Sequence, residues 1–218
     1  MAASNPRFTG ASMTRSRRPQ SAGPAAAAGP ALTGPALTGP AGPQPHVSLP
    51  DDVDCLPHQQ QRHRATLWWV GAHGGAGEST LAALLPQSYG TGHSWPVTPA
   101  SAGDGANAVE PVVLVARTNM SGLRAAQHAA AQWAAGGTSE IQLLGLVLIA
   151  DAPGRLPRPL RDFADVVAGG VPRVWWLPWI EAWRLGQDPA AGPIPRSVRR
   201  LLADLHTLLN TGPTIRNL

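Results

Sequence analysis

The sequence of 218 residues predicts an α/β fold, in which a doubly wound, mostly parallel sheet of about four to five strands follows a disordered N-terminal tail. From residue 65 onward, short apolar segments typical of buried strands alternate with segments of helical periodicity. A glycine-rich loop joins the first of these strands to a helix. Before residue 65, Pro, Gly, Ala and Ser dominate, and such a segment has too little apolar surface to offset the entropy of ordering. We therefore divide the chain into a tail (1–64), a domain (65–210) and a C-terminal tail (211–218).

The tail contains a direct repeat and a loose group of metal-binding residue types. Residues 31–35, Ala-Leu-Thr-Gly-Pro, recur at once as residues 36–40, as is typical of low-complexity segments. Cys55, His58 and His63 are of the types that bind zinc, but their spacing is loose and a fourth ligand is missing. We therefore interpret them as linker residues.

Charge and composition limit the classes of function. All 17 basic residues are arginine, so no lysine can serve a phosphate loop, a Schiff base or a Ser-Lys mechanism. Residues 1–64 carry six Arg and three Asp, whereas residues 65–218 carry eleven Arg and ten Asp or Glu and are nearly neutral. Nucleic-acid contact is therefore confined to the basic tail, where Arg15, Arg17 and Arg18 gather, although a solvated charge run is the favoured interpretation.

The single cysteine and the lengths of the apolar runs bear on the compartment. Cys55 has no partner in the chain for a disulfide, which favours a reducing compartment. No segment has the pattern of a signal peptide, and the apolar run that ends at Ala150 is far shorter than the ~20 residues that span a bilayer. We therefore expect a cytoplasmic protein without a membrane span.

Strands and helices are expected to alternate along the domain. Thr66–Val70 is apolar on both faces and predicts the first strand, and the helix after the glycine loop is short because Pro86 is incompatible with its continuation. Residues 87–110 are rich in Gly and Pro and are expected to be irregular. Ser121 is expected to cap the helix that it begins. The remaining strands are expected at Val112–Ala116, Leu143–Ala150 and Val171–Leu177. The remaining helices are expected from Ser121 to Trp133 or Ala135, at Leu160–Val167, around Trp179–Trp183 and at Val198–Leu209.

The glycine loop has the shape of a phosphate-binding loop but the wrong charge. Its glycines let backbone N–H groups converge on a phosphate at a helix N-terminus, and Ser79 stands at the position whose hydroxyl holds magnesium. Glu78, however, stands where the P-loop lysine meets the β- and γ-phosphates. Two unit charges ~4 Å apart interact by ~4 kcal/mol at an effective dielectric of about 20, so the carboxylate disfavours phosphate unless Arg117 or a metal compensates. The predicted fold is thus that of a degenerate P-loop NTPase-like domain.

A doubly wound sheet places the candidate site at the carboxyl ends of its strands. This rule brings the glycine loop (residues 73–79) to one edge together with residues that follow apolar strand segments: Arg117, Thr118, Asp151 and, at the end of the last strand, Trp179. For Asp151 we favour a simpler role, the capping of the turn after its strand. The predicted cofactor-binding residues are Gly74, Gly75, Gly77, Glu78, Ser79, Thr80, Arg117 and Asp151, and no catalytic residue or metal ligand is predicted.

The loop and the segments around it resemble a known group of ATPases. Residues 73–79, His-Gly-Gly-Ala-Gly-Glu-Ser, resemble the Lys-Gly-Gly-x-Gly-Lys-Ser/Thr loop of the ParA/MinD group. Residues 112–117 with residues 121–123 resemble a later strand and helix of that group, and residues 146–150 resemble the strand after it. Residues 65–210 thus look like a shortened relative of the ParA/MinD ATPases, which implies their P-loop fold.

A second resemblance is closer. Residues 69–81 and residues 150–158 resemble an uncharacterised actinobacterial family that carries no assigned activity. Both signature lysines of the ParA/MinD loop are replaced in this chain, by His73 and Glu78, and no strand bearing the group's magnesium aspartate is recognised. The resemblance implies the fold, and the replacements argue against hydrolysis.

Two functions fit a loop that keeps its shape without its charges. We favour a non-hydrolysing binding or regulatory module, linked to plasmid or mobile-element transfer, segregation or secretion, whose protein partner could be a true ATPase. The alternative is an atypical NTPase in which Arg117 or Arg155 supplies the cation and Glu78 contributes to a metal. An enzyme using His73 as a base is disfavoured, since no Ser/Asp arrangement accompanies this residue. Nucleotide and magnesium stay open as cofactors but are not favoured, and a homodimer stays open.

The tryptophans are expected to serve packing before binding. Four of them lie in predicted strands and are assigned to the core: Trp68, Trp69, Trp175 and Trp176. Trp179 and Trp183, four apart on a short predicted helix, could form an exposed ridge for a partner, but packing is favoured.

Overall fold

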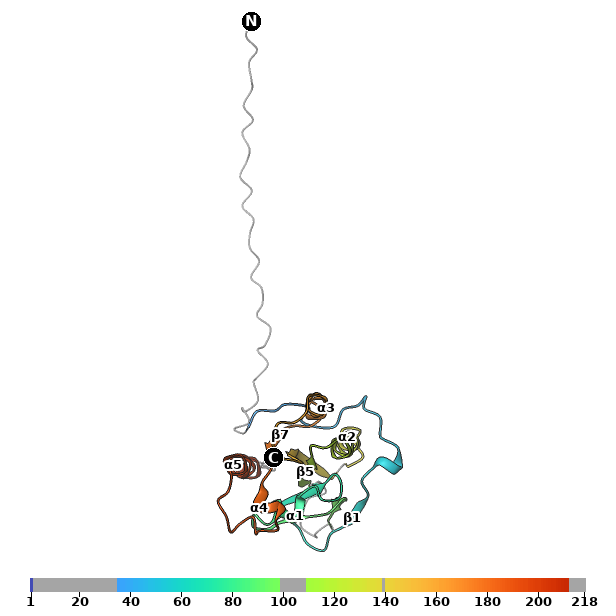
Figure 1. The fold of residues 1–218 in the computed structure, drawn as a ribbon. Helices are drawn as coiled ribbons and strands as arrows, with labels where there is room; N and C mark the ends of the chain where they lie inside the picture. The colour runs from blue at the N-terminus through green and yellow to red at the C-terminus, as the bar shows by residue number, and fades with distance from the viewer. Residues whose placement is uncertain (2–34, 99–108, 139, 212–218) are drawn as a thin grey trace. The chain divides into compact units, whose positions relative to one another are not determined.

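The structure is a computed structural model of the chain, and it describes residue 1 together with residues 35–98, 109–138 and 140–211. The described residues from 35 onward belong to one compact unit, Thr33–Leu218. This unit contains a parallel sheet covered by helices, so the predicted α/β fold is confirmed (Figure 1).

Five parallel strands form the central sheet. In spatial order they are β3 (Ser88–Gly90), β2 (Leu67–Gly71), β5 (Glu110–Arg117), β6 (Ile141–Ile149) and β7 (Val174–Leu177). Counted along the chain, the spatial order of these strands is 2-1-3-4-5, one of the two common doubly wound orders. The prediction of a doubly wound parallel sheet is therefore confirmed.

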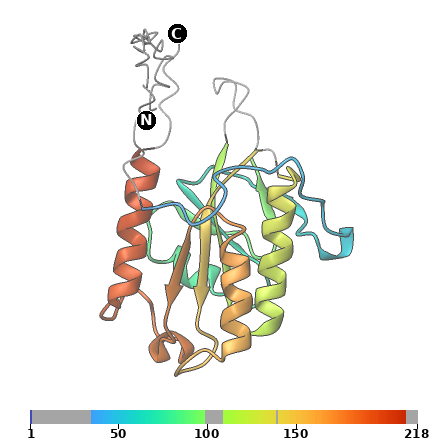
Figure 2. The ribbon, with the colours of Figure 1, turned by 90° about the horizontal axis from the view of Figure 1, so that it is seen from above.

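Helices cover both faces of the sheet, as Figure 2 shows. One face is covered by α2 (Met120–Ala134) and α3 (Arg158–Ala168), and the other by α1 (Glu78–Ala82) and α5 (Arg196–Asn210). The short α4 (Glu181–Arg184) lies between β7 and α5 in the chain. None of the helices within the described residues is long and apolar enough to cross a membrane.

The core is built from strands that are buried on both faces. Side chains of β2 alternate between the two layers: Trp68 packs among residues of the α2 face, whereas Leu67 and Trp69 pack on the α5 face. Trp175 is also buried, but Trp176 is 43% exposed, so its assignment to the core is wrong. Because β7 is an edge strand, a β7 side chain can be left uncovered even when its neighbours are buried.

The irregular chain expected at residues 87–110 contains two short strands. β3 pairs with β2, and β4 (Trp95–Val97) pairs in parallel with β1 (His58–Gln60) in a second, two-stranded sheet. The prediction is therefore wrong for these segments, because strands of three residues are too short to show a period. Residues 99–108 lie outside the described part.

Two local predictions about helix ends also fail. The side chain that caps α2 is Asn119, whose Oδ1 accepts the Gly122 N–H at 2.7 Å, while Ser121 lies inside the helix and donates to the same oxygen. Trp179 precedes α4, so it shares no helix face with Trp183. Trp183 packs against the core on the α5 face, and the Trp179 indole N–H donates to Glu181.

Residues 35–64, which we call the strap, make specific contacts with the domain. The Thr38 N–H donates to the Pro172 carbonyl at 2.8 Å, the Gln44 N–H donates to the Ala134 carbonyl at 2.7 Å, and β1 pairs with β4. The expected disorder therefore does not hold for the strap, because its backbone finds partners that composition alone does not reveal. Residues 2–34 and the C-terminal residues 212–218 lie outside the described part.

A buried glutamine anchors the strap. Gln132 of α2 is 4% exposed, and its Oε1 accepts the Leu56 N–H at 2.9 Å and the Trp95 indole N–H at 2.8 Å. Its Nε2 donates to the Leu56 carbonyl at 3.0 Å. One side-chain amide thus joins the strap and β4 to α2.

A β-bulge interrupts β6. Val112 pairs with Leu143, but Val113 pairs with Gly145, which leaves one extra residue on β6. A Cβ on Gly145 would lie 2.5 Å from the Arg173 carbonyl oxygen and 2.6 Å from the Trp175 ring. The bulge therefore requires glycine at residue 145.

Candidate functional site

The glycine loop and the carboxyl end of β5 meet at the point where the strand order of the sheet reverses. In a 2-1-3-4-5 sheet this switch point lies between the first and third strands, here β2 and β5, and it is the usual place for a ligand. The Arg117 N–H at the end of β5 donates to His73 Nε2 in the loop at 3.0 Å. The predicted convergence of the loop with Arg117 is thus observed.

His73 has a defined tautomer. Because Nε2 accepts a hydrogen bond, the ring proton lies on Nδ1, which donates to the Gly74 carbonyl at 2.9 Å. Both ring nitrogens are therefore used to hold the loop on β5. The arrangement supports a positioning role for His73 and gives no support to a role as a general base.

The loop adopts backbone conformations that favour glycine. Gly75 has φ +72° and Gly77 has φ +109°. The Ala76 N–H donates to the His73 carbonyl at 3.2 Å, which closes a turn within the loop. Gly74 and Gly75 are exposed, and Gly77 directly precedes α1.

The Glu78 side chain turns back into the fold. It is 8% exposed, and its Oε2 accepts the Gly77 N–H at 3.0 Å. A Cβ on Gly71 would lie 2.9 Å from Oε2, and a Cβ on Gly90 would lie 3.4 Å from Cγ. The carboxylate is thus packed between the loop and the glycines of β2 and β3, and it engages the backbone N–H of Gly77.

The helix after the loop is too short to attract an anion strongly. α1 contains five residues, and no side chain caps its N-terminus. The macrodipole arises from aligned peptide units, so a helix of one to two turns contributes little to it. Ser79 is exposed and Thr80 half-buried at the beginning of this helix.

Arg117 supplies the cation of the site. Its Nε donates to the Gly75 carbonyl at 3.3 Å and its Nη1 donates to the Ala150 carbonyl at 3.2 Å. Burial lowers the pKa of the guanidinium, while the charges of Asp151 and Glu78 act to raise it. Arg117 thus bridges the loop and the end of β6, but two of its donors are already engaged by main-chain carbonyls.

Asp151 follows β6, next to Ala150, whose carbonyl accepts a hydrogen bond from Arg117. The Asp151 N–H donates to Thr118 Oγ1 at 3.2 Å, and its side chain is exposed. A pocket of about 250 Å³ opens beside it, between the carboxyl ends of the strands and the loop before α3. Lining residues include Thr118, Asn119, Asp151, Arg155, Leu160 and Trp176. None of the lining residues comes from the glycine loop, so Asp151 faces a separate cavity.

The described residues do not form a metal centre. Nowhere in the described ranges do three His, Cys, Asp or Glu side chains gather as a metal ion would require. In the strap, the Cys55 thiol donates to the Pro50 carbonyl at 3.6 Å. Trp176 was not predicted for this edge of the sheet. It was assigned to the core, and nothing in the sequence marked it as exposed.

A match to a protein family establishes the family to which the chain belongs. Residues 65–202 match a family described as "Family of unknown function (DUF6668)". The chain belongs to this family. No curated protein and no solved structure matches the chain. The DUF6668 segment includes the glycine loop, Arg117 and Asp151 and leaves out the strap.

Proposed function

We propose that this DUF6668 domain is a degenerate, ParA/MinD-like P-loop module that binds or regulates a protein partner without hydrolysing nucleotide. One observation carries the proposal: the Glu78 carboxylate is buried against the loop and accepts the Gly77 N–H at 3.0 Å. A negative charge thus engages a backbone N–H of the loop, which is the kind of group that an active phosphate loop offers to its ligand. The chain has no lysine to counter it.

The electrostatic cost explains why hydrolysis is not expected. A phosphate oxygen ~4 Å from this carboxylate would be repelled by ~4 kcal/mol at an effective dielectric of about 20. Arg117 offsets part of this repulsion, but its Nε and Nη1 donate to backbone carbonyls. Because Glu78 and Arg117 both hydrogen-bond to backbone groups of the fold, we infer that the loop has a structural role and does not bind phosphate.

The proposed setting follows from the ParA/MinD resemblance. We place the module beside a true ATPase in plasmid or mobile-element transfer, segregation or secretion, in the cytoplasm. A chain with one cysteine needs no oxidising compartment, which supports this location. Copurification of the intact protein with an ATPase from its own cells tests this setting, and a homodimer would be detected in the same preparation.

Thermal unfolding with nucleotide tests the absence of binding. A ligand at about 100 times its Kd stabilises the folded state by about 2.7 kcal/mol, which would raise Tm by about 5–10 °C in a chain of this size. We expect no such shift with ATP or GTP and magnesium at about 1 mM. Glu78→Gln is the matched variant, because it keeps the acceptor and removes the charge, and any gain of binding should appear there. Stabilisation of the unaltered protein together with turnover would refute the proposal.

A second candidate is an atypical nucleotide binder that uses Arg117. The observation in its favour is the place of the guanidinium, since Nη2 would lie 4.0 Å from a Cβ on Gly77. This candidate predicts tight nucleotide binding that Arg117→Ala abolishes. Arg124→Ala, an exposed change on α2, is the control and should leave binding unchanged. Equal binding by both variants would exclude the candidate.

A further inference from the structure

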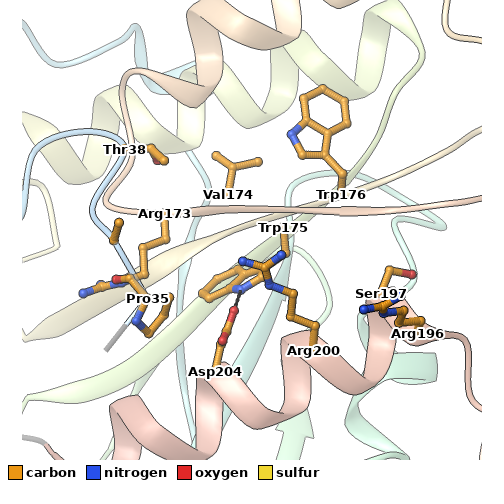
Figure 3. A pocket seen from close by; sticks show the side chains of 11 residues that line it. Pro35, Thr38, Arg173, Val174, Trp175, Trp176, Arg196, Ser197, Arg200 and Asp204 are labelled. Carbon is orange, nitrogen blue, oxygen red and sulfur yellow. Dashed lines mark hydrogen bonds between the residues drawn. The ribbon is translucent and has the colours of Figure 1, made fainter. Parts of the chain in front are cut away.

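A second pocket lies along the outer edge of the sheet. Its volume is about 590 Å³, and it follows β7 between the strap and α5 (Figure 3). Lining residues include Arg173, Trp175, Trp176, Arg196, Arg200 and Asp204. Pro35 and Thr38 of the strap lie at one end. We call this pocket the edge groove.

Within the described residues, the backbone of β7 presents to the edge groove hydrogen-bonding groups that no other strand uses. The carbonyls of Arg173 and Leu177 accept the N–H groups of Leu146 and Ala150 at 2.8 and 2.9 Å, so the odd-numbered residues face β6. Since N–H and C=O directions alternate along a strand, those of Val174 and Trp176 point away from β6. Among the described strands, β7 pairs with β6 alone. An extended chain could therefore pair with this side of β7.

The charge of the edge groove is positive. Arg196 and Arg200 are exposed and stand one turn apart at the beginning of α5, and Arg173 lies on the strand side. The one carboxylate, of Asp204, accepts the Trp175 indole N–H at 3.0 Å. Three arginines against one engaged carboxylate leave an excess positive charge.

This charge is unfavourable for α5 by itself. Like charges at i and i+4 repel, and cations in the first turn oppose the helix macrodipole. The first turn of α5 contains no acidic residue to relieve either effect. A bound anionic group would relieve both, so the arrangement favours an acidic occupant.

We propose that the edge groove binds an acidic, extended peptide segment of another protein, which adds a strand to the sheet at β7. Main-chain bonds to Val174 and Trp176 would supply affinity, and Arg196 and Arg200 would select acidic side chains. Trp176, 43% exposed, points to the other side of β7 from the arginines of α5, where it offers an apolar contact to the added strand.

Other occupants match the edge groove less well. A second copy of this chain, paired edge to edge, would bring the same arginines toward one another. The first 34 residues carry four Arg and no acidic residue, so they lack the required charge. A nucleic acid supplies negative charge but no peptide groups for the edge of β7. The acidic peptide satisfies both requirements.

Selection from a displayed library of random peptides of about twelve residues tests the proposal on the full-length protein. We expect acidic peptides to be enriched. Arg196→Glu/Arg200→Glu should weaken their binding at least about tenfold, since it reverses both selecting charges. Arg199→Glu, which alters an exposed arginine of α5 outside the groove lining, is the matched control and should change little. Methylation of alternate backbone nitrogens in the peptide should also weaken binding, because it removes the strand hydrogen bonds.

Several outcomes would overturn the proposal. The selection would contradict it by enriching no peptide, or only neutral or basic peptides. Equal binding of the peptide to the double variant and to the unaltered protein would also contradict it. So would displacement of the peptide by a single-stranded oligonucleotide. A dimer that dissociates in the double variant would show that a second copy occupies the groove instead. Thermal unfolding of each variant confirms folding. The proposal does not rest on the glycine loop, and its variants leave Glu78 and Arg117 unchanged, so the two proposals fail separately.

Discussion

Replacing Gln132 by leucine should strongly destabilise the protein. The side chain is 4% exposed and makes three hydrogen bonds, to the Trp95 indole N–H and to both backbone groups of Leu56. Leucine keeps much of the volume but leaves these groups unpaired, and each buried unpaired group costs about 1–3 kcal/mol. Because the strap can separate and let water reach Leu56, we expect a total loss of about 3 kcal/mol.

Chemical and thermal unfolding measure this loss. About 3 kcal/mol corresponds to a decrease in Tm of about 6–12 °C for a chain of this length. Gln127→Leu is the matched control, because Gln127 is exposed on the same helix, and its effect should stay within about 0.5 kcal/mol. Hydrogen exchange at the Leu56 amide should accelerate only in the Gln132 variant. Equal stability of the two variants would show that the strap is not held by this amide.

Three further predictions concern other parts of the fold. Asn119→Ala should lower the free energy of unfolding by about 1 kcal/mol, because Asn119 caps α2. Ser121→Ala should lower it by much less. If denaturant titrations show the larger loss for Ser121→Ala, the assigned cap is wrong. Gly145→Ala should cost more than about 2 kcal/mol in the same titrations, since its Cβ would lie 2.5 Å from a backbone carbonyl oxygen, and a neutral effect would show that the bulge can relax. Burial, followed by the charge of Asp52, raises the pKa of the Cys55 thiol, so less thiolate is present near neutrality. Alkylation of Cys55 should therefore be slower than that of an unperturbed thiol at about pH 8, and Asp52→Asn should accelerate it; a rate equal to that of the free thiol would refute this.

The sequence predicted the long strands well because they are buried on both faces. Val112–Ala116 and Leu143–Ala150 are continuous apolar runs, and both lie within or overlap the observed β5 and β6. β3 was missed, since Ser88–Gly90 has no apolar period and becomes a strand only by pairing with β2. The strap was missed for a similar reason, because its order depends on partners far away in the chain.

The sequence predicted that the loop and Arg117 converge, but not which way the Glu78 side chain points. The rule for parallel sheets correctly brought the loop to Arg117, because it depends only on where strands end. The inward turn of Glu78 depends on space left by Gly71 and Gly90, which no local pattern encodes. The edge groove was not predicted, because it combines Arg173 with two arginines of α5, and no sequence pattern indicates that residues this far apart in the chain lie together.

The family segment, residues 65–202, is smaller than the compact unit Thr33–Leu218 to which the strap belongs. A recombinant fragment trimmed to residues 65–202 would uncover the amide of Gln132 and end inside α5, before the fully buried Leu205. Stability and binding measured on such a fragment would differ from those of the intact protein, because both sets of contacts are lost. A recombinant protein that begins before residue 35 and retains all of α5 keeps the hydrogen bonds of the strap to Gln132 and the packing of Leu205.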